Sequence, residues 1–96
     1  MIDRLSVTPD HRKLIVEWEG GGVSELAALT LRQQARDAYT RRAILDFGQI
    51  DVPADIEITA LSQVGPAGVN IAFSDGHDRA IYPFVYLQSL SEQYGN

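Results

Sequence analysis

Alternation of apolar and polar positions in the first third of the chain predicts β-strands. Residues 5–7 and 14–18 alternate in this way, and the turn-forming sequence Pro9-Asp10-His11 lies between them. The two segments are therefore expected to pair as a hairpin. The run Gly20-Gly21-Gly22 supplies the backbone freedom for a second reversal. Residues 23–28 are then expected to continue as a short third strand.

A longer hydrophobic period begins at Thr30 and predicts an amphipathic helix with Thr30 as its N-cap. The apolar stripe falls at i, i+4, i+7 and i+8 and consists of Leu31, Ala35, Ala38 and Tyr39. Most of the arginines of this segment are expected to face away from the stripe. Residues 43–55 show no sustained period and contain Gly48 and Pro53, so they are expected to form a loop.

Alternation returns twice in the second half of the chain. Residues 56–60 and 69–73 are predicted to be antiparallel strands separated by Gly65-Pro66-Ala67-Gly68. Asp75-Gly76 is a strong signal for a two-residue hairpin, which is expected to lead into a last short strand over residues 79–82.

The C-terminal segment predicts a helix that covers the sheet. Pro83 suits its first turn, where the missing N–H is harmless. One stripe of the helix consists of Phe84, Leu87, Leu90 and Tyr94. Val85 lies opposite this stripe, where an exposed apolar side chain mildly favours an interface.

The predicted fold class is α+β, a small antiparallel sheet of hairpins with two short helices. One helix follows Leu31-Arg32 and the other is C-terminal. Residues 1–96 are expected to form a single domain, because a chain of this length can bury one modest core. The large side chains expected to share that core are Trp18, Phe73, Leu87 and Leu90.

The composition is typical of a folded protein of a reducing compartment. Apolar residues make up 45% of the chain and charged residues 22%, far from the composition of disordered segments. Cysteine is absent, which excludes disulfides, thiolate metal ligands and a cysteine nucleophile, so the cytoplasm is the expected location. The first residues lack the apolar core of a secretory signal, and no apolar run approaches the ~18 residues that span a bilayer, so no membrane insertion is expected.

The charge distribution argues against a nucleic-acid partner. The net charge is −5, which repels a polyanion at long range. Four arginines, half of all basic residues, lie within eleven positions: Arg32, Arg36, Arg41 and Arg42. Because no aromatic platform or RNA-binding motif accompanies them, a solvated helix face is the favoured interpretation.

The candidate chemistry is sparse. His11 and His77 are the only histidines, and neither lies in a pattern that would pair an activated hydroxyl with a base and an orienting carboxylate. Ser74 is expected to cap backbone groups of its turn. Asp75 and Asp78 flank His77, but a zinc site needs further convergent ligands. The sequence therefore does not predict an enzyme.

The aromatic residues allow two interpretations. Trp18 is expected to be a core side chain whose indole N–H meets a backbone carbonyl. Tyr82, Tyr86 and Tyr94 could instead contribute to an exposed aromatic patch, because tyrosine is enriched where one end of a ring is buried and the other is wet.

Several motifs together resemble a known family. They are Trp18 before a glycine turn, Leu31-Arg32, Val64-Gly65, Phe73-Ser74-Asp75-Gly76-His77-Asp78, Ile81-Tyr82-Pro83-Phe84 and Tyr86-Leu87. The chain resembles, over nearly its whole length, the domain at the N-terminus of gamma-butyrobetaine hydroxylase. The resemblance implies a small antiparallel sheet with short helices, in agreement with the pattern above.

The resemblance also implies a departure from the metal site of some relatives. In zinc-binding members a Cys-x-Cys-x2-Cys cluster follows Leu-Arg, and the histidine of the Asp-Gly-His turn is the fourth ligand. Here the cysteine positions fall on Ala35, Asp37 and Thr40, which leaves only His77. No zinc or other cofactor is therefore expected, and packing of Ala35 and Tyr39 is expected to take over the local stabilisation.

The function implied by the resemblance is that of a non-catalytic module, since the hydroxylase keeps its iron site in a separate domain. We expect a protein-interaction or accessory module with a protein partner, linked to iron–sulfur cluster assembly or to an oxygenase; self-association is a further option. The alternative is a weak metal- or small-ligand-binding domain centred on the Asp-Gly-His turn. The residues assigned to either role are Arg32, Arg36, Asp75, His77, Asp78 and Tyr82.

Overall fold

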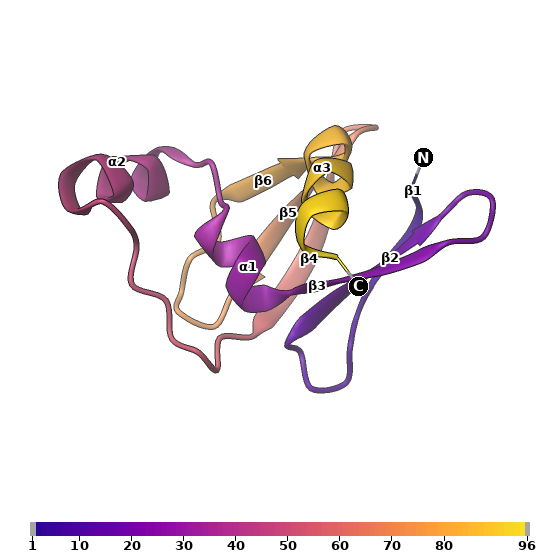
Figure 1. Cartoon of the computed structure of the whole chain (residues 1–96), viewed down its shortest axis with the longest axis horizontal. Helices are drawn as coiled ribbons and strands as arrows, with labels where there is room; N and C mark the ends of the chain where they lie inside the picture. Colours follow the sequence, from indigo (N-terminus) through magenta and orange to yellow (C-terminus); the bar gives the residue numbers. More distant parts are fainter. Residues whose placement is uncertain (1, 96) are drawn as a thin grey trace.

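A computed structural model describes residues 2–95, which form two three-stranded antiparallel sheets and three helices (Figure 1). The first sheet has the order β1-β2-β3, with β1 at Ile2–Val7, β2 at Lys13–Trp18 and β3 at Val23–Ala27. The predicted N-terminal hairpin and third strand are confirmed.

The second sheet has the order β4-β5-β6, with β4 at Ile58–Val64, β5 at Gly68–Phe73 and β6 at Ala80–Pro83. The predicted two-residue hairpin at Asp75-Gly76 is wrong, because strand pairing resumes only where Ala80 meets Ile71. The chain does reverse there, with Gly76 at φ +87°. The intervening residues 74–79, here called the β5–β6 loop, project beyond the sheet and carry His77.

The single helix predicted from Thr30 is in fact two helices, α1 at Ala28–Gln33 and α2 at Ala38–Phe47. Asp37 causes the division, because its side chain accepts a hydrogen bond from the Thr40 backbone N–H and so caps a new helix. Ala27, and not Thr30, is the N-cap of α1. Part of the predicted loop over 43–55 is also helical, since α2 ends only at the left-handed Gly48.

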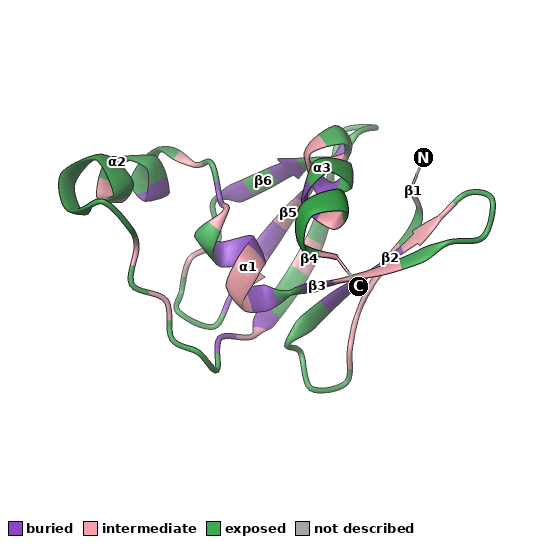
Figure 2. Ribbon diagram, in the orientation of Figure 1, coloured by how far each residue is buried: buried purple, intermediate pink, exposed green. Residues whose placement is uncertain are grey.

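The core lies between the two sheets, α1 and the C-terminal helix α3 (Phe84–Tyr94), where Figure 2 shows most of the buried segments. Phe73, Leu87 and Leu90 are buried there and Trp18 is partly buried against the same core cluster, which confirms the predicted core. The indole N–H of Trp18 donates to the Ser24 hydroxyl at 2.9 Å, not to a backbone carbonyl. Tyr94 is about half exposed, so the predicted stripe of α3 is buried only as far as Leu90.

Helix α2 stands apart from both sheets, at the left end of Figure 1, and is mostly exposed in Figure 2. Thr40 is its only buried residue. Tyr39 is exposed and does not belong to a buried stripe, contrary to the prediction. None of the helices within residues 2–95 is long and apolar enough to cross a membrane.

Candidate functional site

Five polar side chains meet where α1, the start of α2 and the β5–β6 loop come together. This polar cluster consists of Arg32, Asp37, Thr40, Asp75 and His77. Its members come from three elements that are distant in sequence, and each is joined to at least one other by a hydrogen bond. The cluster is therefore a feature of the tertiary structure.

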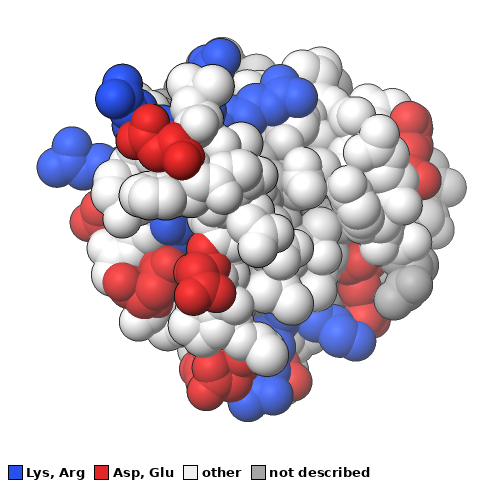
Figure 3. Space-filling view, turned by 60° about the vertical axis from the view of Figure 1, so that its left-hand side comes forward, with Lys and Arg blue, Asp and Glu red and all other residues white. Residues whose placement is uncertain are grey.

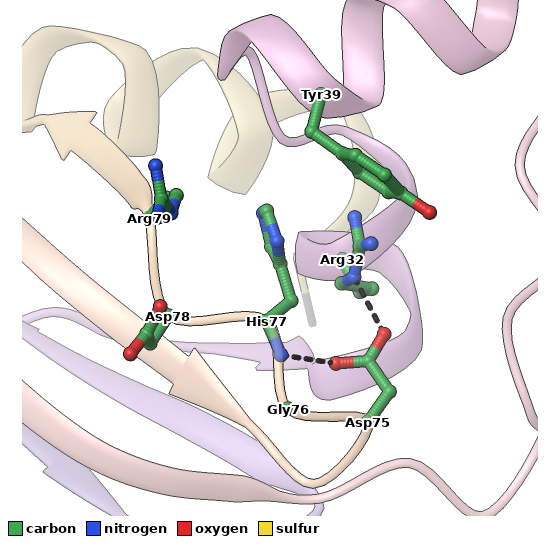
Figure 4. A pocket seen from close by; sticks show the side chains of 7 residues that line it. All are labelled: Arg32, Tyr39, Asp75, Gly76, His77, Asp78 and Arg79. Atoms are coloured by element: carbon green, nitrogen blue, oxygen red, sulfur yellow. Dashed lines mark hydrogen bonds and ion pairs between the residues drawn. The ribbon is translucent and has the colours of Figure 1, made fainter.

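Arg32 joins the three elements of the polar cluster. Its Nε donates to Asp75 Oδ2 at 2.8 Å, a contact drawn in Figure 4, and its Nη1 donates to the Thr40 hydroxyl at 2.9 Å. The residue is buried, so the prediction that the arginines face solvent is wrong for Arg32. The guanidinium tolerates burial because a carboxylate and a hydroxyl satisfy donors on two of its nitrogens.

Asp37 and His77 form a second enclosed pair in the cluster. His77 Nε2 lies 2.8 Å from Asp37 Oδ1, and the two side chains are only 8% and 7% exposed. Thr40 adds its hydroxyl, which donates to Asp37 Oδ1 at 2.7 Å. Burial opposes ionisation of Asp37, but the hydrogen bonds from Thr40 and His77 outweigh it, so its pKa lies below the ordinary value.

Asp75 is held in its ionised form in the same way. Burial raises the pKa of this carboxyl, while the backbone N–H of His77, at 3.0 Å, and the Arg32 guanidinium lower it, and the net shift is downward. Asp75 thus fixes the turn that carries His77 and binds it to α1 (Figure 4).

The resemblance singled out the three cysteine positions, now Ala35, Asp37 and Thr40, and the histidine His77, and these four residues lie in two different environments. Asp37, Thr40 and His77 converge in the polar cluster, whereas Ala35 is buried in the apolar core. The expectation that Ala35 and Tyr39 pack in place of a metal is wrong for Tyr39, whose exposed ring lies with its centroid 6.1 Å from that of His77. The polar cluster occupies that place instead.

These residues do not fit a tetrahedral zinc ion. Ala35 offers no ligand atom, the Thr40 hydroxyl lies against the Arg32 cation, and His77 Nε2 is directed at Asp37. Within residues 2–95, no group of three or more His, Cys, Asp or Glu side chains is arranged to hold a metal ion. The donor chemistry present is that of a hydrogen-bond network.

Two other residues assigned to the site lie elsewhere. Tyr82 is buried and its hydroxyl donates to the Leu31 carbonyl, so the prediction that it contributes to an exposed aromatic patch or reaches a ligand is wrong. Burial also raises its pKa, which keeps the hydroxyl protonated as a donor. Arg36 stacks over the ring of Tyr86, with its guanidinium carbon 3.8 Å from the ring centroid.

An open cavity of about 350 Å³ adjoins the polar cluster. Figure 4 shows its lining residues, which are Arg32, Tyr39, Asp75, Gly76, His77, Asp78 and Arg79. Arg32, Asp75 and His77 are engaged with one another or with Asp37 and Thr40. The cavity therefore presents mainly the exposed side chains of Tyr39, Asp78 and Arg79 for any further contact.

Sequence reasoning missed the role of the other histidine. His11 adopts a positive φ of 63°, its backbone carbonyl accepts a hydrogen bond from Ile58 N–H at 2.7 Å, and its Nδ1 lies 3.2 Å from the Ile58 carbonyl oxygen. It thus connects the turn of the first hairpin to β4. The Ser74 hydroxyl does bind a backbone group, the Glu57 N–H at 2.9 Å, but this group belongs to the segment before β4 and not to the turn of Ser74 itself.

Helix α2 carries a group of exposed apolar side chains that sequence reasoning also missed. This α2 surface consists of Tyr39, Ile44, Leu45 and Phe47, with Leu45 and Phe47 81% and 80% exposed. Figure 3 turns this end of the molecule forward and shows charged side chains mainly around the margin of a broad uncharged area. Such exposure on one short helix is unusual for a monomeric domain.

Comparison with known proteins matches most of the chain to one family. Residues 5–88 match the family described as gamma-butyrobetaine hydroxylase-like, N-terminal. A crystal structure of a protein of unknown function from the DUF971 family of Acidithiobacillus ferrooxidans has a TM-score of 0.74 and 24% identity, covering 94% of this chain and 91% of that one. No curated protein matches the chain.

Two solution structures share the fold. One has a TM-score of 0.75 at 23% identity and covers 96% of this chain and 69% of that one. The other has a TM-score of 0.72 at 16% identity and covers 97% and 73%.

Proposed function

We propose, from the premise that the chain belongs to the gamma-butyrobetaine hydroxylase-like N-terminal domain family, that it is a non-catalytic protein-interaction module. The observation that carries the proposal is the α2 surface. Leu45 and Phe47 on this helix are about four-fifths exposed, whereas α1 and α3 bury leucines in the core. A partner that covers these side chains would gain the free energy of burying apolar surface.

The arrangement of the α2 surface favours a groove on the partner. Leu45 and Phe47 are two residues apart, so they leave the helix on different sides. A flat surface would cover only one of them. A groove into which the helix inserts would cover both, as in other helix-in-groove complexes.

The charge of this region favours an acidic margin on that groove. Residues 28–47 hold four arginines and two aspartates, a net charge of +2, whereas the remainder of the chain carries −7. Arg41 is exposed at the side of α2, and Arg42 is paired with Asp46 at 3.0 Å. Acidic groups on a partner would therefore be attracted to this end of the molecule and repelled by the rest.

The histidines and hydroxyls of the chain support a non-catalytic role. His77 is paired with Asp37, Thr40 donates its hydroxyl proton to the same carboxylate, and the Ser74 hydroxyl is used by the backbone of Glu57. A hydroxyl nucleophile needs a base that accepts its proton, and here the histidine and the hydroxyl share an acceptor instead.

The resemblance indicates which partners to examine first. Domains of this type are attached to an oxygenase and to ATPases of iron–sulfur cluster assembly, so those two classes in the cytoplasm are the first candidates. The proposal is that α2 meets such an enzyme while the module itself contributes no catalytic group.

Site-specific photocrosslinking tests the proposal in the cells that make the protein. Benzoylphenylalanine in place of Phe47 should give a discrete adduct, and the same group in place of Val23, an exposed apolar residue on β3, should not. Excess wild-type chain should suppress the Phe47 adduct, whereas excess Leu45→Ser chain should compete poorly. Equal adducts from both positions, or none from either, would contradict the proposal.

The cavity beside the polar cluster favours a second candidate, a weak site for a metal ion or small ligand at the Asp-Gly-His turn. Its support is an opening of about 350 Å³ with Asp78 and Arg79 at its wall. Native mass spectrometry with added Zn²⁺, Fe²⁺ or Ni²⁺ tests the metal form. Stoichiometric binding that is lost in a folded His77→Ala variant would favour this candidate over the interaction module.

A further inference from the structure

Helix α2 lacks the apolar anchor that holds the other helices. It has ten residues, and Thr40 is the only one that is buried. Isolated helices of this length are marginal in water, so tertiary contacts must account for its order. By contrast, α1 and α3 insert leucines into the core. The contacts that keep α2 in place must therefore be sought near Thr40.

Those contacts converge on one guanidinium. The Thr40 hydroxyl accepts from Arg32 Nη1 at 2.9 Å and donates to Asp37 Oδ1 at 2.7 Å, so the cap of α2 and its first turn are tied to α1. On its other edge, Arg32 Nε binds Asp75, which fixes the β5–β6 loop and with it His77. His77 in turn contacts Asp37 at 2.8 Å, so the β5–β6 loop is also joined to the N-cap of α2.

We propose that Arg32 is the positioning residue for α2 and so controls whether the α2 surface is presented in one fixed orientation. The polar cluster is held together by charge-assisted and short hydrogen bonds, which depend on geometry far more than apolar packing does. Loss of one member therefore releases α2 as a unit while the core remains packed. Where the resemblance places two of the zinc cysteines, this chain has Asp37 and Thr40, whose hydrogen bonds to His77 and Arg32 join the same segments.

The consequence for binding rests on the proposed function, but the positioning role does not. A released α2 would still carry Leu45 and Phe47, but it would have to be ordered again when a partner binds. Affinity would then fall without any change in the residues that touch the partner. The polar cluster would thus change the affinity for a partner without contacting that partner.

Hydrogen exchange of the α2 amides, residues 41–48, tests the positioning role without a partner. In Arg32→Met and in Thr40→Val, exchange of these amides should rise by about tenfold or more, the factor expected for losing a charge-assisted hydrogen bond. Amides of β2 and β5 should keep their wild-type rates. Thr40→Ser, which keeps the hydroxyl, should restore slow exchange in α2.

The exposed Arg41 provides the matched control, because Arg41→Met removes an arginine from the same region without touching the polar cluster. If Arg32→Met does not fold, Thr40→Val decides, since it replaces a hydroxyl with a methyl of similar size. Unchanged α2 exchange in Thr40→Val, or equal acceleration in α2, β2 and β5, would overturn the proposal. Failure of photocrosslinking at Phe47 with the expected exchange result would count only against the interaction module.

Discussion

The apolar core and helix α2 are stabilised by different means within one small domain. The core brings together side chains of both sheets, α1 and α3, and its contacts are non-directional. Helix α2 is attached through the polar cluster, in which each side chain has a specific hydrogen-bond partner. The core should therefore tolerate changes that preserve apolar volume, whereas the attachment of α2 should fail when a single hydrogen-bonding group is removed.

The largest effect is expected in the core. Phe73→Ala would leave a cavity between the sheets and should lower the free energy of unfolding by about 3–5 kcal/mol, a serious loss for a domain of this size. Chemical denaturation followed by Trp18 fluorescence measures it. Val85→Ala on the exposed side of α3 is the control and should change stability by less than about 0.5 kcal/mol. A Phe73→Ala variant of wild-type stability would contradict the described core.

The second-largest effect is expected at low pH, which should loosen α2 before it disturbs the apolar core. The pKa values of Asp37 and Asp75 are lowered in the folded state, so both carboxylates stabilise the structure above their ordinary pKa of 3.8. That contribution is lost as the pH falls through the lowered values. NMR spectra recorded from pH 6 downward should show α2 resonances broadening below about pH 4 while core resonances persist. Simultaneous loss of both sets would argue against separate anchoring.

A smaller effect is expected from the cap of α2. Asp37→Ala removes the acceptor of the Thr40 N–H and the partner of His77, and should destabilise α2 by about 1–2 kcal/mol. Hydrogen exchange of residues 41–48 measures this loss locally. Asp37→Asn keeps an oxygen for the cap and should recover part of the protection. Equal behaviour of the two variants would show that capping is not the operative contact.

The smallest effect is expected at the surface of α2. The pair between Arg42 and Asp46 is exposed and spans one helical turn, so Asp46→Ala should cost about 0.3–0.5 kcal/mol at most. The change should vanish at high salt, because exposed ion pairs are screened. A loss as large as that of Asp37→Ala would mean that α2 depends on its surface charges and not on the polar cluster.

Hydrophobic periodicity was sufficient for most of the fold. The alternation of residues 14–18 and 69–73 placed two strands correctly, and the stripe of Leu87 and Leu90 placed the C-terminal helix. Periodicity misjudged the middle of the chain, because Asp37 interrupts the helix without disturbing the spacing of apolar residues. An aspartate within a helical pattern is a candidate N-cap, and this is the signal that could have revealed the start of the second helix.

The candidate site was predictable only in part. The Asp-Gly-His turn and the positions of Asp37 and Thr40 could be singled out from the sequence. Arg32 was assigned both to the candidate site, with Asp75 and His77, and to a solvated helix face, and only the solvated face is wrong, since a paired arginine can be buried. Its partners are distant in sequence, and the Asp75 that pairs with it lies in the β5–β6 loop. No local pattern reports such a pairing.

The sequence by itself determined the fold class and most of the core, because these follow from the order and spacing of apolar residues along the chain, and its motifs determined the family. Only the tertiary structure decided that Arg32 is buried, that Tyr82 is a core donor and that α2 stands free with Leu45 and Phe47 exposed. The physical reason is the distance along the chain over which each effect acts. Periodicity acts between neighbouring turns, whereas a buried charge or an uncovered helix depends on segments that folding brings together.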